Sequence, residues 1–256
     1  MHGPDGIDYP NRANYLEVDK HSQLVYDHGV TEDRPPLFRV TVIFSELKGK
    51  TKMDLTMTLP SSQAVEETQK CIRKQGGNTT WDRLSEFLEK TATGREKFVI
   101  VRSFDAPLEL MFEMWTNPKH FSHWLPPIGF EMQFIRSEIK PGGSIFYFMS
   151  DNDHKMYGRA DYLEMQKPNR LVYAQQFCDE NEEVTRHPMA MAWPETILTT
   201  VELAEEGPEQ TRVTLTWEPY GPTTPEELET FIKFKSNMTQ GWTGSFDKLD
   251  ARLANR

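Results

Sequence analysis

The sequence predicts an α+β fold in which a curved antiparallel sheet wraps around a long C-terminal helix. The first observation is a β-rich run, Phe98–Phe104, followed by two short helix signals and six more strand-like runs. The second is an apolar–polar alternation in the last two runs, which gives the sheet one apolar face. The third is an amphipathic series near the C-terminus. Its apolar stripe must cover that face of the sheet.

Two short helices are predicted directly after the first strand. Asp105-Ala106-Pro107 ends the strand with a helix-start signal, and the first helix is expected over residues 108–116. Asn117-Pro118 repeats this signal and opens a second helix, which Pro126-Pro127 closes. The sheet is therefore interrupted by helices after its first strand only.

The remaining strands follow one another and are separated by turn residues. They are expected at residues 131–140, 144–150, 155–166, 170–178, 197–204 and 211–218. Pro141-Gly142-Gly143 joins the first two as a hairpin turn. In the last two strands, Val201 and Leu203 share one face, and Val213 and Leu215 share the matching face.

The C-terminal helix begins at a capping box, Thr224-Pro225-Glu226-Glu227, with proline at the first helical position. An apolar series at helical spacing follows it: Leu228, Phe231, Met238, Trp242, Phe246, Leu249 and Leu253. At about 1.5 Å per residue, a helix of this extent would be roughly 40 Å long.

Part of this pattern occurs twice in the chain. Tyr15-Leu16-Glu17 recurs as Tyr162-Leu163-Glu164, and Leu24-Val25-Tyr26 recurs at the same spacing as Leu171-Val172-Tyr173. The identical spacing indicates an internal repeat rather than a compositional coincidence.

The two copies end alike but differ in extent. Trp81-Asp82-Arg83-Leu84 corresponds to Phe246-Asp247-Lys248-Leu249, whereas residues 95–153 have no counterpart in the first copy. We therefore expect residues 1–90 to be the C-terminal half of a domain that lacks its first strands and short helices. Residues 91–95 are expected to be a linker, and residues 96–256 a complete domain.

Short motifs across the second copy resemble one known superfamily. They are Phe104-Asp105-Ala106-Pro107, Trp115-Thr116-Asn117-Pro118, Trp124-Leu125-Pro126-Pro127, Ile139-Lys140-Pro141-Gly142-Gly143 and Gly241-Trp242. In this order they resemble the SRPBCC or START-like helix-grip superfamily, in the branch named after the C-terminal domain of the activator of the ninety-kilodalton heat-shock chaperone's ATPase. The resemblance implies a helix-grip fold with a pocket between the sheet and the C-terminal helix.

The first copy resembles the same family from the end of its third strand onward. Residues 2–6 resemble the usual turn, and Met1 lies where such domains often carry a strand-ending methionine, so Met1 is expected to be an internal methionine. A half-domain would leave the inner face of its sheet uncovered, including Val40, Val42 and Met53. Such a face predicts association, either with strands that a longer gene product would add or with a second copy in a homo-oligomer.

Composition and charge exclude several classes of partner. The chain has 29 Lys+Arg against 39 Asp+Glu, and a net charge of −10 gives no electrostatic basis for binding nucleic acid. No apolar run reaches the ~20 residues of a membrane span, and the N-terminus has no signal-peptide pattern. Cys71 and Cys178 lie far apart, which predicts no disulfide framework and a reducing, cytoplasmic location.

Large apolar side chains are available to line a pocket under the C-terminal helix. The candidate lining residues are Trp115, Trp124, Phe134, Phe146, Phe148, Tyr173, Trp193, Trp217, Phe231, Met238 and Trp242. The alternative is that these side chains fill an ordinary core. Gly241 and Gly244 lie inside the helix, where each costs about 1 kcal/mol relative to Ala. We therefore expect a ligand or a neighbouring segment to approach the helix backbone there.

The sequence supplies little for catalysis. His120 and His123 share a helix face, but no carboxylate at helical spacing completes a ligand set, so we predict no metal, no cofactor and no catalytic residue. Residues 184–194, which include His187, are expected to form a loop that overhangs the pocket.

Three functions fit these observations. The first, which we favour, is an intracellular binding protein that holds a small hydrophobic or amphipathic molecule in the pocket. The second is an interaction protein that acts as a chaperone co-factor, as the resemblance implies. The third is a cyclase- or aromatase-type enzyme of the wider superfamily, for which the sequence identifies no proton-transferring pair.

Overall fold

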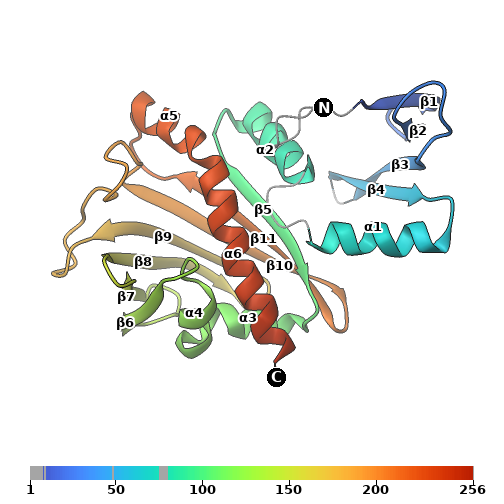
Figure 1. Cartoon of the computed structure of the whole chain (residues 1–256). Helices are drawn as coiled ribbons and strands as arrows, with labels where there is room; N and C mark the ends of the chain where they lie inside the picture. The colour runs from blue at the N-terminus through green and yellow to red at the C-terminus, as the bar shows by residue number, and fades with distance from the viewer. Residues whose placement is uncertain (1–7, 9, 48, 75–79, 256) are drawn as a thin grey trace. The chain divides into compact units, whose positions relative to one another are not determined.

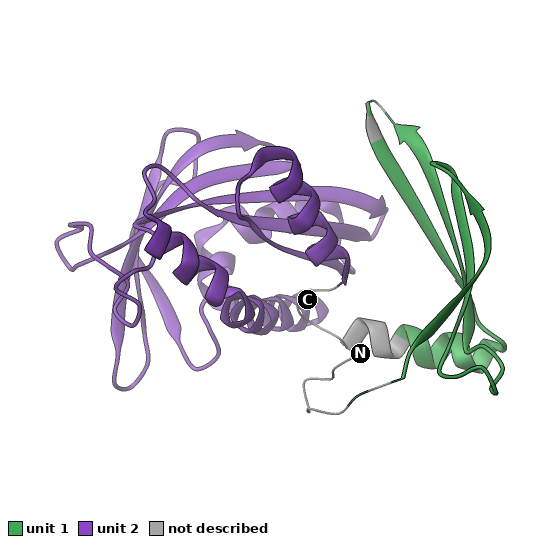
Figure 2. Cartoon of the chain, turned by 90° about the horizontal axis from the view of Figure 1, so that it is seen from above, with its two compact units in different colours: residues 1–75 green, residues 76–256 purple. Residues whose placement is uncertain are grey.

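The computed structural model of the chain describes residues 8, 10–47, 49–74 and 80–255. It divides into two compact units, Met1–Gln75 (unit 1) and Gly76–Arg256 (unit 2), which are coloured separately in Figure 2. The turn expected at residues 2–6 and the side chain of Cys71 lie outside the described part. None of the described helices combines the length and the apolarity that a bilayer crossing requires.

Unit 2 follows the predicted order of elements. These are α2 (Thr80–Thr93), β5 (Phe98–Phe104), α3 (Leu108–Thr116), α4 (Pro118–Trp124), β6 (Glu131–Ser137), β7 (Ser144–Ser150), β8 (Lys155–Gln166), β9 (Arg170–Cys178), β10 (Thr196–Gly207), β11 (Gln210–Pro219), α5 (Pro225–Lys233) and α6 (Lys235–Ala254), labelled in Figure 1. From β5 onward, the strands and the two short helices lie within a few residues of their predicted positions.

The strands of unit 2 form one antiparallel sheet in the order β5-β11-β10-β9-β8-β7-β6. Figure 1 shows α6 lying across one face of this sheet. The side chains that meet there form a single core, in which Leu171, Val201, Leu215, Phe246 and Leu249 are 0% exposed. The predicted α+β helix-grip fold, with a sheet around a C-terminal helix, is therefore confirmed.

The two short helices are fixed by their own sequence signals. Asn117 ends α3 and caps α4, because its side-chain oxygen accepts the backbone N–H of Lys119 at 3.1 Å. The indole N–H of Trp124 donates to the carbonyl of Met114 at 2.9 Å and ties α4 to α3. Both tryptophans of this region, Trp115 and Trp124, are consequently buried.

The C-terminal helix is divided in two. The capping box is present, since the Thr224 hydroxyl accepts the N–H of Glu227 at 3.2 Å and the Glu227 carboxylate accepts the N–H of Thr224. Phe234, with φ −84° and ψ −1°, separates α5 from α6, so the apolar series does not run along one uninterrupted helix. The α6 segment of 20 residues is about 30 Å long.

Unit 1 is a four-stranded antiparallel sheet followed by a helix. Its elements are β1 (Arg12–Asp19), β2 (Gln23–Gly29), β3 (Phe38–Leu47), β4 (Lys50–Thr58) and α1 (Ser62–Lys74), with the sheet order β1-β2-β3-β4. Val40 and Val42 are 2% and 5% exposed, so the expectation that they are uncovered is wrong. They lie on β3, which is paired on both sides, whereas Met53 on the edge strand β4 is 36% exposed.

The repeated strand pair has the same pairing register within each of the two sheets. Tyr15 pairs with Tyr26 in unit 1, and Tyr162 pairs with Tyr173 in unit 2. A β-bulge lies directly after Tyr15 and again directly after Tyr162. The repeated sequence motifs therefore occupy equivalent positions in the two sheets.

Helix α2 belongs to unit 2, although the repeat assigns its sequence to the first copy. The Glu86 carboxylate accepts the N–H of Val99 on β5 at 2.9 Å and the ammonium of Lys235 on α6 at 2.9 Å. The compact units thus divide after Gln75 rather than near residue 90, because α2 is hydrogen-bonded to two elements of unit 2.

Candidate functional site

A cavity of about 410 Å³ lies in unit 2 between the apolar face of the sheet and α6. Aromatic side chains line much of it, and they are Phe121, Tyr147, Tyr173, Phe177, Trp193, Trp217, Phe234 and Trp242. The other lining residues are Leu125, Pro127, Ile145, Met149, Met156, Ala160, Gln175, Gln176, His187, Met189, Glu195, Ile197, Asn237, Met238, Gly241 and Ser245, together with Tyr157, whose ring lies on the outer face of β8 beside Phe148. The volume falls in the range of small-molecule sites.

Five of the candidate residues line this cavity: Tyr173, Trp193, Trp217, Met238 and Trp242. They come from β9, β11, α6 and the connection between β9 and β10, and the fold brings them together under the helix. Two of them, Trp217 and Trp242, meet edge to face with ring centroids 5.5 Å apart.

Four candidates belong to the packed core instead of the cavity wall. Trp115, Trp124 and Phe231 are at most 1% exposed and are surrounded by other side chains. Phe134 stacks on Phe121 with ring centroids 6.3 Å apart. The core alternative therefore describes these four, which come from α3, α4, α5 and β6.

Phe146 and Phe148 lie on the opposite face of β7. Their neighbours in the strand, Ile145, Tyr147 and Met149, line the cavity, and side chains alternate between the two faces. Phe146 stacks on Tyr157, with centroids 6.0 Å apart. The segment is apolar at both alternating sets of positions, so its sequence alone does not reveal which set faces inward.

One side of the cavity is open and carries two polar side chains, those of Glu195 and Asn237. Met189, Glu195, Asn237 and Gly241 line it and are exposed, which marks the mouth between α6 and the connection at residues 179–195. Sequence analysis missed the cavity-lining role of Glu195 and Asn237. Both are ordinary surface residue types without periodic signal, and only the fold places them at an opening.

The two glycines of α6 have different surroundings. A Cβ on Gly244 would lie 3.1 Å from the side chain of Ile128, so this glycine permits a close contact with the segment after α4. That segment is also held by the Ser245 hydroxyl, which donates to the carbonyl of Leu125 at 2.7 Å. A Cβ on Gly241, by contrast, would meet nothing within 4 Å, and this glycine faces open space at the mouth.

Burial shifts the pKa values of three titratable groups of the cavity, those of His187, Tyr147 and Tyr173, towards their neutral forms. It lowers the pKa of His187, and the Nδ1 atom of His187 accepts the backbone N–H of Met189 at 3.0 Å, which requires that nitrogen to be unprotonated. Burial likewise raises the pKa of Tyr147 to about 12. Tyr173 is also shifted, its pKa being raised chiefly by burial. These phenols therefore remain protonated at neutral pH.

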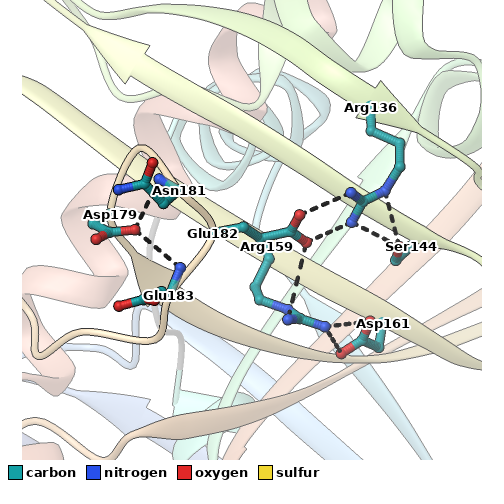
Figure 3. A network of polar contacts seen from close by, with 8 residues as sticks. All are labelled: Arg136, Ser144, Arg159, Asp161, Asp179, Asn181, Glu182 and Glu183. Atoms are coloured by element: carbon teal, nitrogen blue, oxygen red, sulfur yellow. Dashed lines mark hydrogen bonds and ion pairs between the residues drawn. The ribbon is translucent and has the colours of Figure 1, made fainter.

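The connection between β9 and β10 is anchored at its start by a network of polar contacts (Figure 3). The Asp179 carboxylate accepts the N–H groups of Asn181 and Glu183, both at 2.9 Å. The Glu182 carboxylate accepts from Arg136 on β6 at 2.8 Å and lies 3.9 Å from the guanidinium of Arg159 on β8. Hydrogen bonding to Arg136 lowers the pKa of Glu182.

A second anchor lies nearer the cavity. The Arg186 guanidinium donates to Glu227 at the start of α5, at 2.5 Å, and to the carbonyl of Trp193 at 3.3 Å. The aromatic ring of Trp193 packs 5.8 Å from Phe231. These contacts hold the expected overhanging loop in place so that Trp193 forms part of the cavity wall.

Comparisons with solved structures support the fold. The chain is similar to protein Ms6760 from Mycobacterium smegmatis, with 19% identity and a TM-score of 0.51 over 61% of this chain and 90% of that one. It is also similar to a protein from Arthrobacter aurescens, with 23% identity and a TM-score of 0.53 over 62% of this chain and 87% of that one. A protein from Rhodobacter sphaeroides is also similar, with 19% identity and a TM-score of 0.51 over 62% of this chain and 93% of that one.

Comparison with protein families covers both units. Among curated proteins, none matches the chain. A family model, described as activator of Hsp90 ATPase homolog 1-like protein, matches residues 1–89 and again residues 105–254. The second match spans the helix-grip fold from α3 to α6, without β5, and together the two matches span most of the sequence. With motifs, fold and family model in agreement, the chain belongs to the activator of Hsp90 ATPase homolog 1-like protein family.

Proposed function

We propose that unit 2 is a binding module that takes a small hydrophobic or amphipathic molecule into the cavity under α6. The observation that carries the proposal is the cavity itself, which has a volume of about 410 Å³, aromatic walls and one open side. Transfer of an apolar molecule from water into such walls is favourable by about 25 cal/mol per Å² of buried apolar surface. Aromatic side chains supply most of that surface.

Two small residues support a cavity rather than incomplete packing. Gly241 lies within α6, where glycine costs about 1 kcal/mol relative to alanine. No neighbouring atom requires it, since an added Cβ would meet nothing within 4 Å. Ala160 lines the cavity from β8 and is 1% exposed. Larger side chains at these two positions would reduce the space that a ligand needs.

A fluorescence titration tests this proposal. N-phenyl-1-naphthylamine is neutral and becomes brighter in apolar surroundings, so saturable binding to the full chain is expected. Gly241→Leu places a side chain at the mouth and removes a helical glycine, and it should weaken binding by about tenfold or more without loss of stability. Gln240→Leu is the matched control, because Gln240 is an exposed neighbour on α6 that does not line the cavity. Equal binding by both variants would contradict the proposal.

A chaperone co-factor role is a second candidate, and exposed apolar residues on α2 favour it. Trp81, Leu84 and Leu88 are 46%, 37% and 56% exposed and share one face of the helix. Stimulation of Hsp90 ATPase by the full chain, lost in Trp81→Ser and Leu88→Ser, would support this role. No stimulation would leave ligand binding as the function of the chain.

A further inference from the structure

The described residues that line the cavity include an acidic side chain and no lysine or arginine. Glu195 at the mouth supplies the negative charge. His187 is neutral because burial lowers its pKa. An anionic ligand would therefore lose its hydration without gaining a counter-charge, and it would approach a carboxylate of the same sign.

Four cationic residues are chain neighbours of lining residues, and all four are engaged elsewhere. Arg159 is paired with Asp161 at 3.0 Å, and Lys235 is paired with Glu86 at 2.9 Å. Arg186 is paired with the Glu227 carboxylate at 2.5 Å. Lys155 lies over the Phe148 ring, 4.0 Å from its centroid, on the face of the sheet that points away from the cavity. Lys155 also lies 4.8 Å from the centroid of Tyr157. None of these four cations is thus a free counter-charge for an anion in the cavity.

Aromatic rings line the same cavity as Glu195. Trp193 precedes Glu195 by two residues in the chain, and its ring lies 5.9 Å from those of Phe234 and His187. Phe177 contacts His187 with centroids 4.6 Å apart. The faces of aromatic rings attract cations, and an aromatic cage with an acidic residue at its edge is a common way to bind an organic ammonium group.

We infer that the ligand of this cavity is a hydrophobic cation, namely an amine or a quaternary ammonium compound. Its apolar part fills the cavity, and its charged group lies at the mouth beside Glu195 and Trp193. This inference rests on the proposed function and adds the chemical class of the ligand.

The mouth is also the place where a charged group costs least. A charge taken fully into the aromatic interior would lose its hydration, whereas Glu195 and Asn237 are exposed and keep the opening wet. A cation held there retains water on one side and gains the carboxylate and the ring faces on the other. Contacts of the cation–π kind at exposed sites change affinity by about twofold to fivefold each.

Two matched probes test the inference with the full chain. They are (1-naphthylmethyl)trimethylammonium and 1-naphthylmethanesulfonate, which share the aromatic group and differ in the sign of the charge. Each is titrated by displacement of N-phenyl-1-naphthylamine. The cation is expected to bind at least about tenfold more tightly than the anion. Equal affinities, or tighter binding of the anion, would overturn the inference.

Charge reversal at the mouth provides the second readout. Glu195→Lys should reduce the cation-to-anion preference by about tenfold, because it replaces an attraction by a repulsion for one probe and does the opposite for the other. Glu209→Lys is the control, since it makes the same change in net charge at an exposed residue that does not line the cavity. An unchanged preference in Glu195→Lys, or an equal change in both variants, would overturn the inference.

The neutral dye separates this inference from the proposed function. If N-phenyl-1-naphthylamine binds saturably and the charged probes show no preference for the cation, the ligand class is wrong and the binding module stands. If the dye does not bind at all, the proposed function itself fails.

Discussion

The sheets of units 1 and 2 have the same local geometry and very different burial. Tyr15 and Tyr26 pack with ring centroids 5.3 Å apart, and Tyr162 and Tyr173 pack at the same distance, 5.3 Å. Yet Tyr15 is 57% exposed, whereas Tyr162 is 1% exposed. We propose that the sheets of the two units descend from one repeated sequence.

This difference in burial separates two causes: the strands themselves determine the pairing register, and the elements around them determine burial. Register and bulge follow from the local side-chain pattern, because they occur in both units. Burial comes from added elements. In unit 2 the counterpart of edge strand β1 is β8, which is flanked by β7, and the counterpart of edge strand β4 is β11, which is flanked by β5. Helix α6 then covers the face between them.

The largest expected effect is a contrast between the two repeated tyrosines. Tyr162→Ala should destabilise unit 2 by about 3–5 kcal/mol, because it opens a cavity in a packed core. Tyr15→Ala should change stability by no more than about 0.5 kcal/mol, as for other exposed side chains. Urea unfolding followed by tryptophan fluorescence measures this, since all six tryptophans lie in unit 2.

Tyr15→Ala would need a readout in unit 1, for which far-ultraviolet circular dichroism is suitable. If the two substitutions cost the same, Tyr15 is covered in solution as fully as Tyr162. That result would contradict the difference in burial between the two sheets.

The second prediction concerns α2, which the repeat and the structure assign to different units. Glu86→Ala removes the acceptor for both the Val99 N–H and the Lys235 ammonium, and it should cost about 2 kcal/mol. Glu89→Ala removes a pair with Lys97 in which the Glu89 side chain is 44% exposed, so the expected cost is below about 1 kcal/mol. Tryptophan fluorescence during urea unfolding measures both.

Equal effects of Glu86→Ala and Glu89→Ala would mean that α2 is not fixed to unit 2. The boundary near residue 90, which the repeat predicts, would then describe the molecule better than the boundary after Gln75.

Elements with strong local signals could be predicted from the sequence, and choices made by tertiary contacts could not. The capping box at Thr224 and the cap at Asn117 formed as predicted, because each depends on atoms only two or three residues apart. The unit to which α2 belongs and the break between α5 and α6 at Phe234 depend on partners distant in sequence. Glu86, for example, contacts a lysine 149 positions away.

The candidate site shows the same division. Trp217 lies on a strand with clear alternation, which allowed its inward direction to be predicted. The segment from Ser144 to Ser150 is apolar on both faces, and the prediction chose Phe146 and Phe148 where the fold uses Tyr147. A single-residue change of register exchanges the two sets, and nothing within the segment opposes it.

The third prediction uses a connection that differs between the units. Residues 30–37 join β2 to β3, whereas the longer connection 179–195 joins β9 to β10 and is anchored by Glu182. Glu182→Gln should cost about 1 kcal/mol at pH 7, because the Arg136 and Arg159 guanidinium groups lose their negative partner. Glu183→Gln, a neighbour in the same turn, is the control. Equal costs would show that the network does not hold the connection.

Acid should abolish the Glu182 effect. The pKa of Glu182 is lowered in the folded chain from an ordinary 4.5, so its ionised form stabilises the fold above that pH. As the pH falls below 4.5, the unfolded chain takes up this proton first, and the stabilisation is lost progressively until the pH passes below the lower pKa of the folded chain. The stability difference between the wild-type chain and Glu182→Gln should therefore shrink in acid, and a constant difference would contradict the assignment.

The smallest effect is expected at His187, which has no counterpart in the short connection of unit 1. Burial against Phe177 and Trp193 lowers its pKa below the ordinary 6.5, so the unfolded chain binds this proton more readily than the folded chain. Stability should thus decrease as the pH falls below 6.5, by less than about 1 kcal/mol at pH 6. His187→Gln should remove that part of the decrease, and an NMR titration of the imidazole should place its pKa below 6.5. A pKa at or above 6.5 would mean that the connection leaves His187 open to water, and the cavity would then lose the neutral wall on which its preference for a cation depends.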